Sequence, residues 1–220
     1  MDKVSKRTPV WLQIDYPDRQ LDRVTTFFRP LAAIPILIIL ASIGGAPFGW
    51  ETGPWEFNWP GIPGLLVVGP ALMVVFRRKY PRWWFDWNLN LSQFSTRVMA
   101  YMGLLTDRYP STEDEQDVDL MLRYPEASED LNRWLPLVKW LLAIPHYIVL
   151  CFMNIAAFMI VILAWFAILF TGRYPKPLFY FVVGVLRWNL RVIAYAFMLI
   201  TDNYPAFSLE QQATEADSPE

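Results

Sequence analysis

The chain has 220 residues, of which 55% are apolar, 16% are aromatic and 18% are charged, a composition typical of a membrane protein rather than a soluble domain. The 19 Lys and Arg residues nearly balance the 21 Asp and Glu residues, so the net charge of −2 indicates no particular partner, and we expect no nucleic-acid binding. A single cysteine, Cys151, excludes an intrachain disulfide and a cysteine-based metal site.

We expect residues 1–11 to form a cytoplasmic tail. Basic residues occur there, but Asp15, Asp18 and Asp22 precede the first apolar stretch, which is unlike a cleaved signal peptide.

The dipeptide Tyr-Pro occurs three times in each half of the chain and indicates an internal repeat. The motif F-R-R-K-Y-P from Phe76 returns as F-T-G-R-Y-P from Phe170, which predicts a duplicated unit of roughly 90 residues, with repeat 1 at 12–110 and repeat 2 at 120–208. Tyr-Pro pairs lie where apolar segments meet charged ones, so we interpret their tyrosines as interfacial anchors: Tyr16, Tyr80, Tyr109, Tyr124, Tyr174 and Tyr204.

Repeat 1 is expected to begin with a helical hairpin at 27–77, with arms at 27–43 and 62–77. A loop rich in Gly, Pro and Trp at 44–61 would join the arms. Its tryptophans are candidates for contact with a partner protein, because aromatic residues are enriched at interfaces: Trp50, Trp55 and Trp59.

An amphipathic helix is predicted at 83–105, because apolar residues recur there at steps of three and four. We expect it to lie in the membrane interface, with Trp84 and Trp87 as anchors and Arg97 binding lipid headgroups or a partner. Asp107, which follows, and Asp202 in repeat 2 are interpreted as turn or capping residues that could also pair with nearby cations.

An acidic linker at 111–119 is expected to separate the repeats. No charged residue occurs between Lys139 and Arg173, and one helix of that length would exceed the bilayer core of about 30 Å. We therefore predict a second hairpin at 136–171 that turns near 151–155. A single helix bent at Pro145 is the alternative.

The last predicted element is an interfacial helix at 178–200, by analogy with the one in repeat 1. Arg187 and Arg191 would bind headgroups or a partner, and Trp188 would anchor the helix at the interface. Residues 209–220 form a polar tail.

Basic residues flank both ends of each predicted hairpin, whereas the hairpin tips carry no Lys or Arg. The positive-inside rule then places both termini in the cytoplasm. The predicted fold class is an all-α integral membrane protein of two parallel repeats, related by an axis along the membrane normal. Whether the short arms cross the bilayer or re-enter it stays open.

The sequence offers little for catalysis, and we predict no enzyme activity. No nucleophile lies beside a base, and no carboxylates converge within the apolar segments. The single histidine, His146, is a weak candidate for haem or chlorophyll ligation, although a core position is the more common role. We expect no metal and no cofactor, and we expect bound lipid.

Several motifs of the second half resemble a known family: T-G-R-Y-P from Thr171, G-V-L-R-W-N from Gly184, R-V-I-A-Y-A-F from Arg191 and T-D-N-Y-P-A-F from Thr201. They resemble the bacterial membrane proteins grouped as domain of unknown function 4389, and the first half resembles a diverged second copy. The resemblance implies a protein of the bacterial cytoplasmic membrane and implies no activity.

Three functions fit these observations. We favour a scaffold or accessory subunit of a larger membrane complex, with membrane lipids and other integral membrane proteins as partners. Lipid binding or membrane shaping is the first alternative. A small transporter or channel with an anion site at Arg97 and Arg191 is the second.

Overall fold

A computed structural model describes residues 9–17, 21–44, 71–77, 79–111, 116–125 and 131–211. The predicted loop with Trp50, Trp55 and Trp59, the first part of the predicted arm at 62–77, the first half of the linker's acidic run and both ends of the chain lie outside these ranges. The described elements, in chain order, are β1 (Val10–Ile14), α1 (Arg23–Ala32), α2 (Ile34–Gly44), a helical segment at 71–77, α4 (Arg82–Met102), β2 (Val118–Leu122), the short 3₁₀ helix η1 (Leu135–Leu137), α5 (Lys139–Leu142), α6 (Ile144–Thr171) and α7 (Lys176–Ala196).

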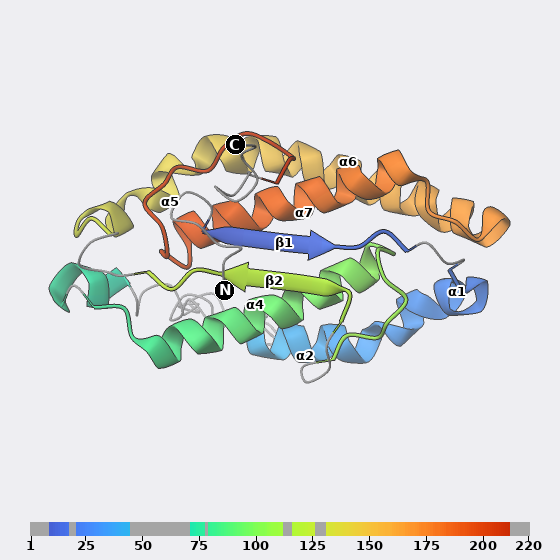
Figure 1. Ribbon diagram of the computed structural model, residues 1–220, viewed down its shortest axis with the longest axis horizontal. Coiled ribbons are helices and arrows are strands. Elements are labelled where there is room, and N and C mark those ends of the chain that lie inside the picture. The colour runs from blue at the N-terminus through green and yellow to red at the C-terminus, as the bar shows by residue number, and fades with distance from the viewer. Residues whose placement is uncertain are drawn as a thin grey trace, which may run out of the picture.

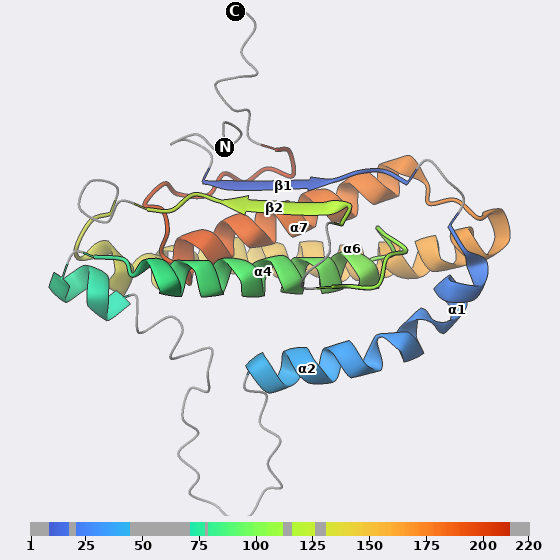
Figure 2. The ribbon, with the colours of Figure 1, turned by 60° about the horizontal axis from the view of Figure 1, so that its bottom comes forward.

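The elements form layers that all run along the long axis of the molecule (Figure 1). The two strands form the outermost layer, α4 and α7 lie directly beneath them, and α1 and α2 lie on the opposite side (Figure 2). Helix α6 runs beside α7 (Figure 1). The strands and the long helices therefore run parallel to the layers. A line perpendicular to the layers passes from the ribbon through α4 and α7 to the side of α1 and α2.

The strands form a two-stranded antiparallel ribbon, in which Leu12 pairs with Leu120. Alternate residues point down onto the helices and are buried, among them Val10, Ile14 and Val118. The expected all-α fold is thus corrected: the described chain is mostly helical but carries this ribbon. Each strand has only five residues and begins in a segment interpreted as a tail or linker and ends in the predicted repeat that follows, where local pattern is weak.

Helix α6 is continuous through 151–155, which corrects the predicted hairpin at 136–171 and agrees with the single-helix alternative. Its sequence has neither Gly nor Pro between His146 and Thr171, so nothing locally favours a turn. The helix ends at Gly172, which adopts a left-handed φ of 73° as helix-terminating glycines commonly do.

Breaks occur instead at Ala33 and Ala143, two residues before a proline in the repeated sequence Ala-Ile-Pro. Proline lacks the N–H for a helical hydrogen bond and clashes with the carbonyl four residues earlier. Helices α1 and α2 are bent by 40° at Ala33, so the predicted arm at 27–43 is a broken helix.

Helices α4 and α7 confirm the helices predicted at 83–105 and 178–200. The apolar sides of both helices and the inner face of the ribbon form the main core, with α6 contributing Ala164 and Ile168. Gly184 brings the segment that follows α7 close to the helix, because a Cβ there would lie 2.8 Å from the Cβ of Leu209.

Candidate functional site

Two cations are buried in the protein and paired with aspartates. Arg29 of α1 is 2% exposed and forms an ion pair with Asp107. Its Nη1 donates to the carbonyl oxygens of Tyr101 and Thr106, at 3.1 and 3.0 Å. The guanidinium also lies 4.7 Å from the ring centre of Tyr101. This cation therefore fastens the start of the α1–α2 helix pair to the segment that follows α4.

Lys139 makes the corresponding contacts in the second half. Its Nζ is fully buried, lies 2.6 Å from Oδ1 of Asp202, and donates to the carbonyl of Thr201 at 2.6 Å. It also lies 5.3 Å from the ring centre of Tyr195. Burial lowers the pKa of Lys139, and hydrogen bonding and charge attraction from Asp202 oppose that shift. Both aspartates thus form the ion pairs that the sequence analysis gave as an additional role beside turn formation or capping.

Tyrosines of the Tyr-Pro pairs connect the two halves of the chain. The hydroxyl of Tyr16, just after β1, donates to the carbonyl of Tyr174. The hydroxyl of Tyr124, just after β2, donates to the carbonyl of Tyr80. Each half therefore contributes a tyrosine hydroxyl to the other half.

A phenylalanine lies between the rings of each tyrosine pair. The ring of Phe179 meets those of Tyr16 and Tyr174 edge to face, with centres 5.1 and 5.6 Å apart. The ring of Phe85 meets those of Tyr124 and Tyr80 in the same way, at 5.2 and 6.3 Å. We call these two groups the aromatic clusters.

We expect the protein to lose stability as the pH rises above the ordinary tyrosine pKa. Burial raises the pKa of Tyr80 and Tyr174 above the model-compound value of 10.0. Above pH 10 the folded state then binds more protons than the unfolded state, so the free energy of unfolding falls with pH, by at most about 1.4 kcal/mol per unit for each tyrosine. Below that pH the contribution is fully present.

Unfolding in detergent between about pH 8 and pH 11 would measure this slope. Tyr80→Phe should reduce the slope, although it also loses the hydrogen bond to Met198, whereas exposed Tyr109→Phe should keep the wild-type slope. Equal slopes in the wild type, Tyr80→Phe and Tyr109→Phe would contradict the conclusion that buried Tyr80 causes part of this pH dependence.

The three arginines predicted to bind headgroups or a partner each donate to a backbone carbonyl of the chain. Arg97 donates to Ser111 at 2.6 Å, and Arg187 donates to Leu12 of β1 at 3.1 Å. Arg191 is buried and donates to Ser208. These contacts hold the ribbon and the segments that follow α4 and α7. Binding of headgroups by the same residues stays a prediction.

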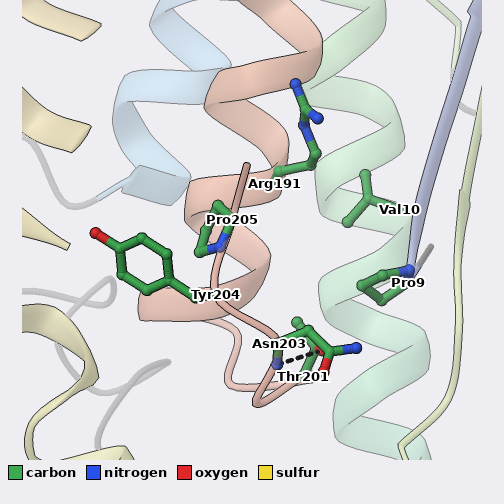
Figure 3. Close-up of a pocket in the computed structure, with 7 residues that line it drawn as sticks. All are labelled: Pro9, Val10, Arg191, Thr201, Asn203, Tyr204 and Pro205. Carbon is green, nitrogen blue, oxygen red and sulfur yellow. Dashed lines mark hydrogen bonds between the residues drawn. The ribbon is translucent and has the colours of Figure 1, made fainter. Parts of the chain in front are cut away.

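A cavity of about 250 Å³ lies beside Arg191. Figure 3 shows its guanidinium directed away from Thr201 and Asn203, the polar side chains at the other end of the cavity. The charged group and the hydroxyl and amide groups therefore do not converge on one point, and the cavity gives no support to an anion site. The residues around it are Pro9, Val10, Arg191, Thr201, Asn203, Tyr204 and Pro205.

His146, the candidate macrocycle ligand, is fully buried at the start of α6. Its Nδ1 accepts a hydrogen bond from Nε1 of Trp188 at 3.1 Å, and its ring stacks on Phe207 with centres 3.9 Å apart. A metal macrocycle would reach this ring only after the aromatic side chains moved. In the described structure the histidine joins α6, α7 and the segment after α7.

The predicted aromatic anchors fall into groups that differ in exposure. Three are buried and fill the core instead of facing an interface, which corrects their expected position: Tyr80, Tyr174 and Trp188. Three are exposed: Tyr109, Tyr204 and Trp87. Three are half-buried: Tyr16, Tyr124 and Trp84.

An apolar groove of about 580 Å³ opens where α1 and the end of α4 approach α6 and α7. Its walls are aliphatic and aromatic side chains, with Arg29 and Asn154 as the polar members. Ala157 of α6 lies at the wall, where its small side chain leaves room. A groove of this chemistry suits a hydrocarbon chain.

Helix α6 exposes an apolar stripe along its whole length. Only 17% of its most apolar window is buried by the protein. Large apolar side chains on α1 and α2 are exposed as well, including Phe27, Leu31 and Ile38. The α6 apolar stripe consists of Ile144, Ile148, Phe152, Ile155, Phe158, Met159, Ile162, Leu163, Phe166 and Phe170.

This fold defines a mostly helical protein in which α6 and α7 are each long and apolar enough to cross a membrane. The bent pair formed by α1 and the first part of α2 would be a third such span if it acted as one unit. These properties are compatible with a membrane location.

Residues 134–208 match the family described as "Domain of unknown function (DUF4389)". The matched segment covers roughly a third of the chain, from just before η1 into the segment after α7, and includes the motifs in which the resemblance was seen. No curated protein and no solved structure matches the chain.

Proposed function

We propose that this protein is a non-catalytic integral component of a bacterial membrane, acting as a scaffold or accessory subunit of a larger complex. The observation that carries the proposal is the contrast between its two kinds of surface. The buried cations and the three arginines bind groups of the chain itself, whereas large apolar side chains of α1, α2 and α6 are exposed. Exposed apolar patches of this size mark contact with lipid or protein.

The proposal includes two tandem copies of one unit. Matching residues support it by making matching contacts: Arg29 with Asp107 and Lys139 with Asp202. The only described non-glycine residues with positive φ also match, since Leu104 and Leu199 have values of 62° and 59°. Leu12 and Leu120, which pair in the ribbon, each lie four residues before a Tyr-Pro tyrosine.

The two copies would exchange their strands. Strand β1 of the first copy lies on α7 of the second, where Arg187 binds the carbonyl of Leu12. Strand β2 of the second copy lies on α4 of the first, where Gln93 binds the carbonyl of Leu120 at 3.0 Å. An axis perpendicular to the ribbon would relate the copies, as expected for parallel repeats in a membrane. Both termini would lie on the cytoplasmic side.

Isolation of the tagged full chain from its native membrane in mild detergent tests the accessory-subunit proposal. We expect a stoichiometric integral membrane protein to co-purify, identified by mass spectrometry against a mock isolation from untagged membranes. A free monomer or homo-oligomer that carries only lipid would contradict the proposal.

Lipid binding is the second candidate function, and the apolar groove favours it. Ala157→Phe should fill the groove and reduce co-purified lipid at least several-fold, as measured by native mass spectrometry. Leu163→Phe is the matched control, because Leu163 lies on the same helix and is exposed outside the groove. Equal lipid content in both variants and the wild type would contradict binding in the groove.

A further inference from the structure

We infer that the protein lies in the plane of one membrane leaflet, with the ribbon facing water and α6 running along the membrane rather than across it. The inference rests on the membrane location in the proposed function and names the surface that contacts lipid. The surface is the α6 apolar stripe with the exposed apolar side chains of α1 and α2, and its partner is the hydrocarbon of a single leaflet.

The first step is the position of the ribbon on the helices. Arg187, which binds the carbonyl of Leu12, lies near the middle of α7. Gln93, which binds the carbonyl of Leu120, lies near the middle of α4. Since Leu12 and Leu120 are the central pair of the ribbon, a membrane-crossing α7 would place the ribbon at the centre of the bilayer.

The second step is that such a ribbon is incompatible with hydrocarbon. A two-stranded ribbon has outward-facing backbone N–H and C=O groups along both edges. Arg187 and Gln93 bind the two central carbonyls, and lipid offers no hydrogen bonds to the other outward-facing groups. The outer face of the ribbon also carries exposed Asp119, paired with Gln13 one residue from the centre. Helix α4 would place Asp86 and Arg97 in the same layer. These groups belong in water or among headgroups.

The third step links α6 to α7. The start of α6 packs with the end of α7, where Ala143 and Leu150 share a cluster with Tyr195. Farther along, Ala164 and Ile168 of α6 join the main core with Phe179 of α7. Contact along its length means that α6 cannot cross the membrane unless α7 and the ribbon cross with it.

The exposed charges agree with this orientation. The ribbon and its flanks expose Asp15, Asp117 and Asp119, which suits an aqueous side. Of the exposed basic residues in the described ranges, Arg108 pairs with Asp117 beside the ribbon. The others lie beside helix ends, where their side chains can extend to headgroups: Arg23, Arg77, Lys79, Arg82, Arg133, Arg173 and Lys176.

A depth profile along α6 tests the inference. Single cysteines replace Ile148, Ile155, Met159 and Phe166 in a Cys151→Ser background, and each is spin-labelled in vesicles of phosphatidylethanolamine and phosphatidylglycerol. All four positions lie on the exposed stripe, and the outer two are about 27 Å apart along the helix. We expect depths that agree within about 5 Å, because an in-plane helix stays at one level.

A spanning helix gives a different profile and would overturn the inference. The central labels would then be deepest, and the labels at 148 and 166 would lie in opposite leaflets. Gln13→Cys on the outer face of the ribbon serves as the control and should react fully with a membrane-impermeant thiol reagent. Labels on α6 that stay in water would overturn both this inference and the membrane location, whereas a spanning profile leaves the accessory-subunit proposal intact.

Oriented circular dichroism of the unmodified chain in aligned bilayers provides a test that needs no substitution. We expect the spectrum of helices that lie parallel to the bilayer plane. Helix axes along the bilayer normal would overturn the inference even if a cysteine variant failed to fold.

Discussion

Asp202→Ala is expected to lower the free energy of unfolding by about 3–5 kcal/mol, because it leaves a fully buried ammonium group without its counter-ion. Lys139 is 0% exposed, and its Nζ lies 2.6 Å from Asp202. The Thr201 carbonyl and the Tyr195 ring would remain as its neighbours, and neither carries a compensating charge. Reversible unfolding in detergent would measure the loss.

The pH dependence of the variant should identify the cause. Burial lowers the pKa of folded Lys139 below its model-compound value of 10.5. In the variant without the carboxylate, Lys139 binds its proton more tightly in the unfolded state than in the folded state. The free energy of unfolding of Asp202→Ala should therefore rise with pH in the range below 10.5. The wild type should show a smaller rise, since Asp202 favours the charged form.

A second substitution provides the decisive control. Lys139→Met in the Asp202→Ala background removes the unpaired charge and should recover most of the loss. Asp119→Ala, on the exposed face of the ribbon, should change stability by no more than about 0.5 kcal/mol. A double variant as unstable as Asp202→Ala would show that the loss does not come from the buried ammonium.

Phe179→Ala is expected to cost about 3–5 kcal/mol, the usual range for truncating a buried phenylalanine. The side chain is 0% exposed and packs between the rings of Tyr16 and Tyr174. Its loss would open a cavity in the aromatic cluster that connects the two halves, and would weaken the packing of the segment after β1. Unfolding and backbone hydrogen exchange at β1 would measure the two effects.

The aromatic clusters offer a matched comparison. Phe85→Ala, in the other cluster, should cost a similar amount and should loosen β2 rather than β1. Phe179→Leu preserves most of the volume and should cost less than Phe179→Ala. Exposed Phe170→Ala should have little effect on an isolated protein. Equal increases in backbone hydrogen exchange at β1 and β2 in Phe179→Ala would contradict the expectation that each aromatic cluster stabilises its own strand.

Helix α4 could be predicted because its apolar residues recur with helical spacing over about six turns, and α7 was predicted by analogy with it. The two aspartates, Asp107 and Asp202, could be recognised from the sequence for another reason, because a Thr-Asp pair occurs at the matching place in each half. The sequence pattern did not predict that the side chains of Arg29 and Lys139 are buried. Both belong to the basic residues that flank the predicted hairpins. Burial of a cation depends on distant segments that cover it.

The predicted turn in α6 failed because it rested on bilayer thickness. Nothing in 146–171 breaks helical geometry, and a helix that lies along the membrane, as inferred above for α6, is not limited by that thickness. The ribbon was missed because its pairing joins residues more than a hundred positions apart, and a five-residue strand has little local signal.

The sequence by itself determined the apolar character of the chain, the positions of α4 and α7, and the recurrence of short motifs in its two halves, because these depend on composition and spacing. Only the tertiary structure decided which half each contact serves. Tyr16 and Tyr124 reach across to the opposite half, and β1 and β2 each lie on the helix of the other half. The physical reason, under the duplication proposed above, is that two copies of one unit present two equivalent surfaces, and long-range packing alone selects which of them a strand covers.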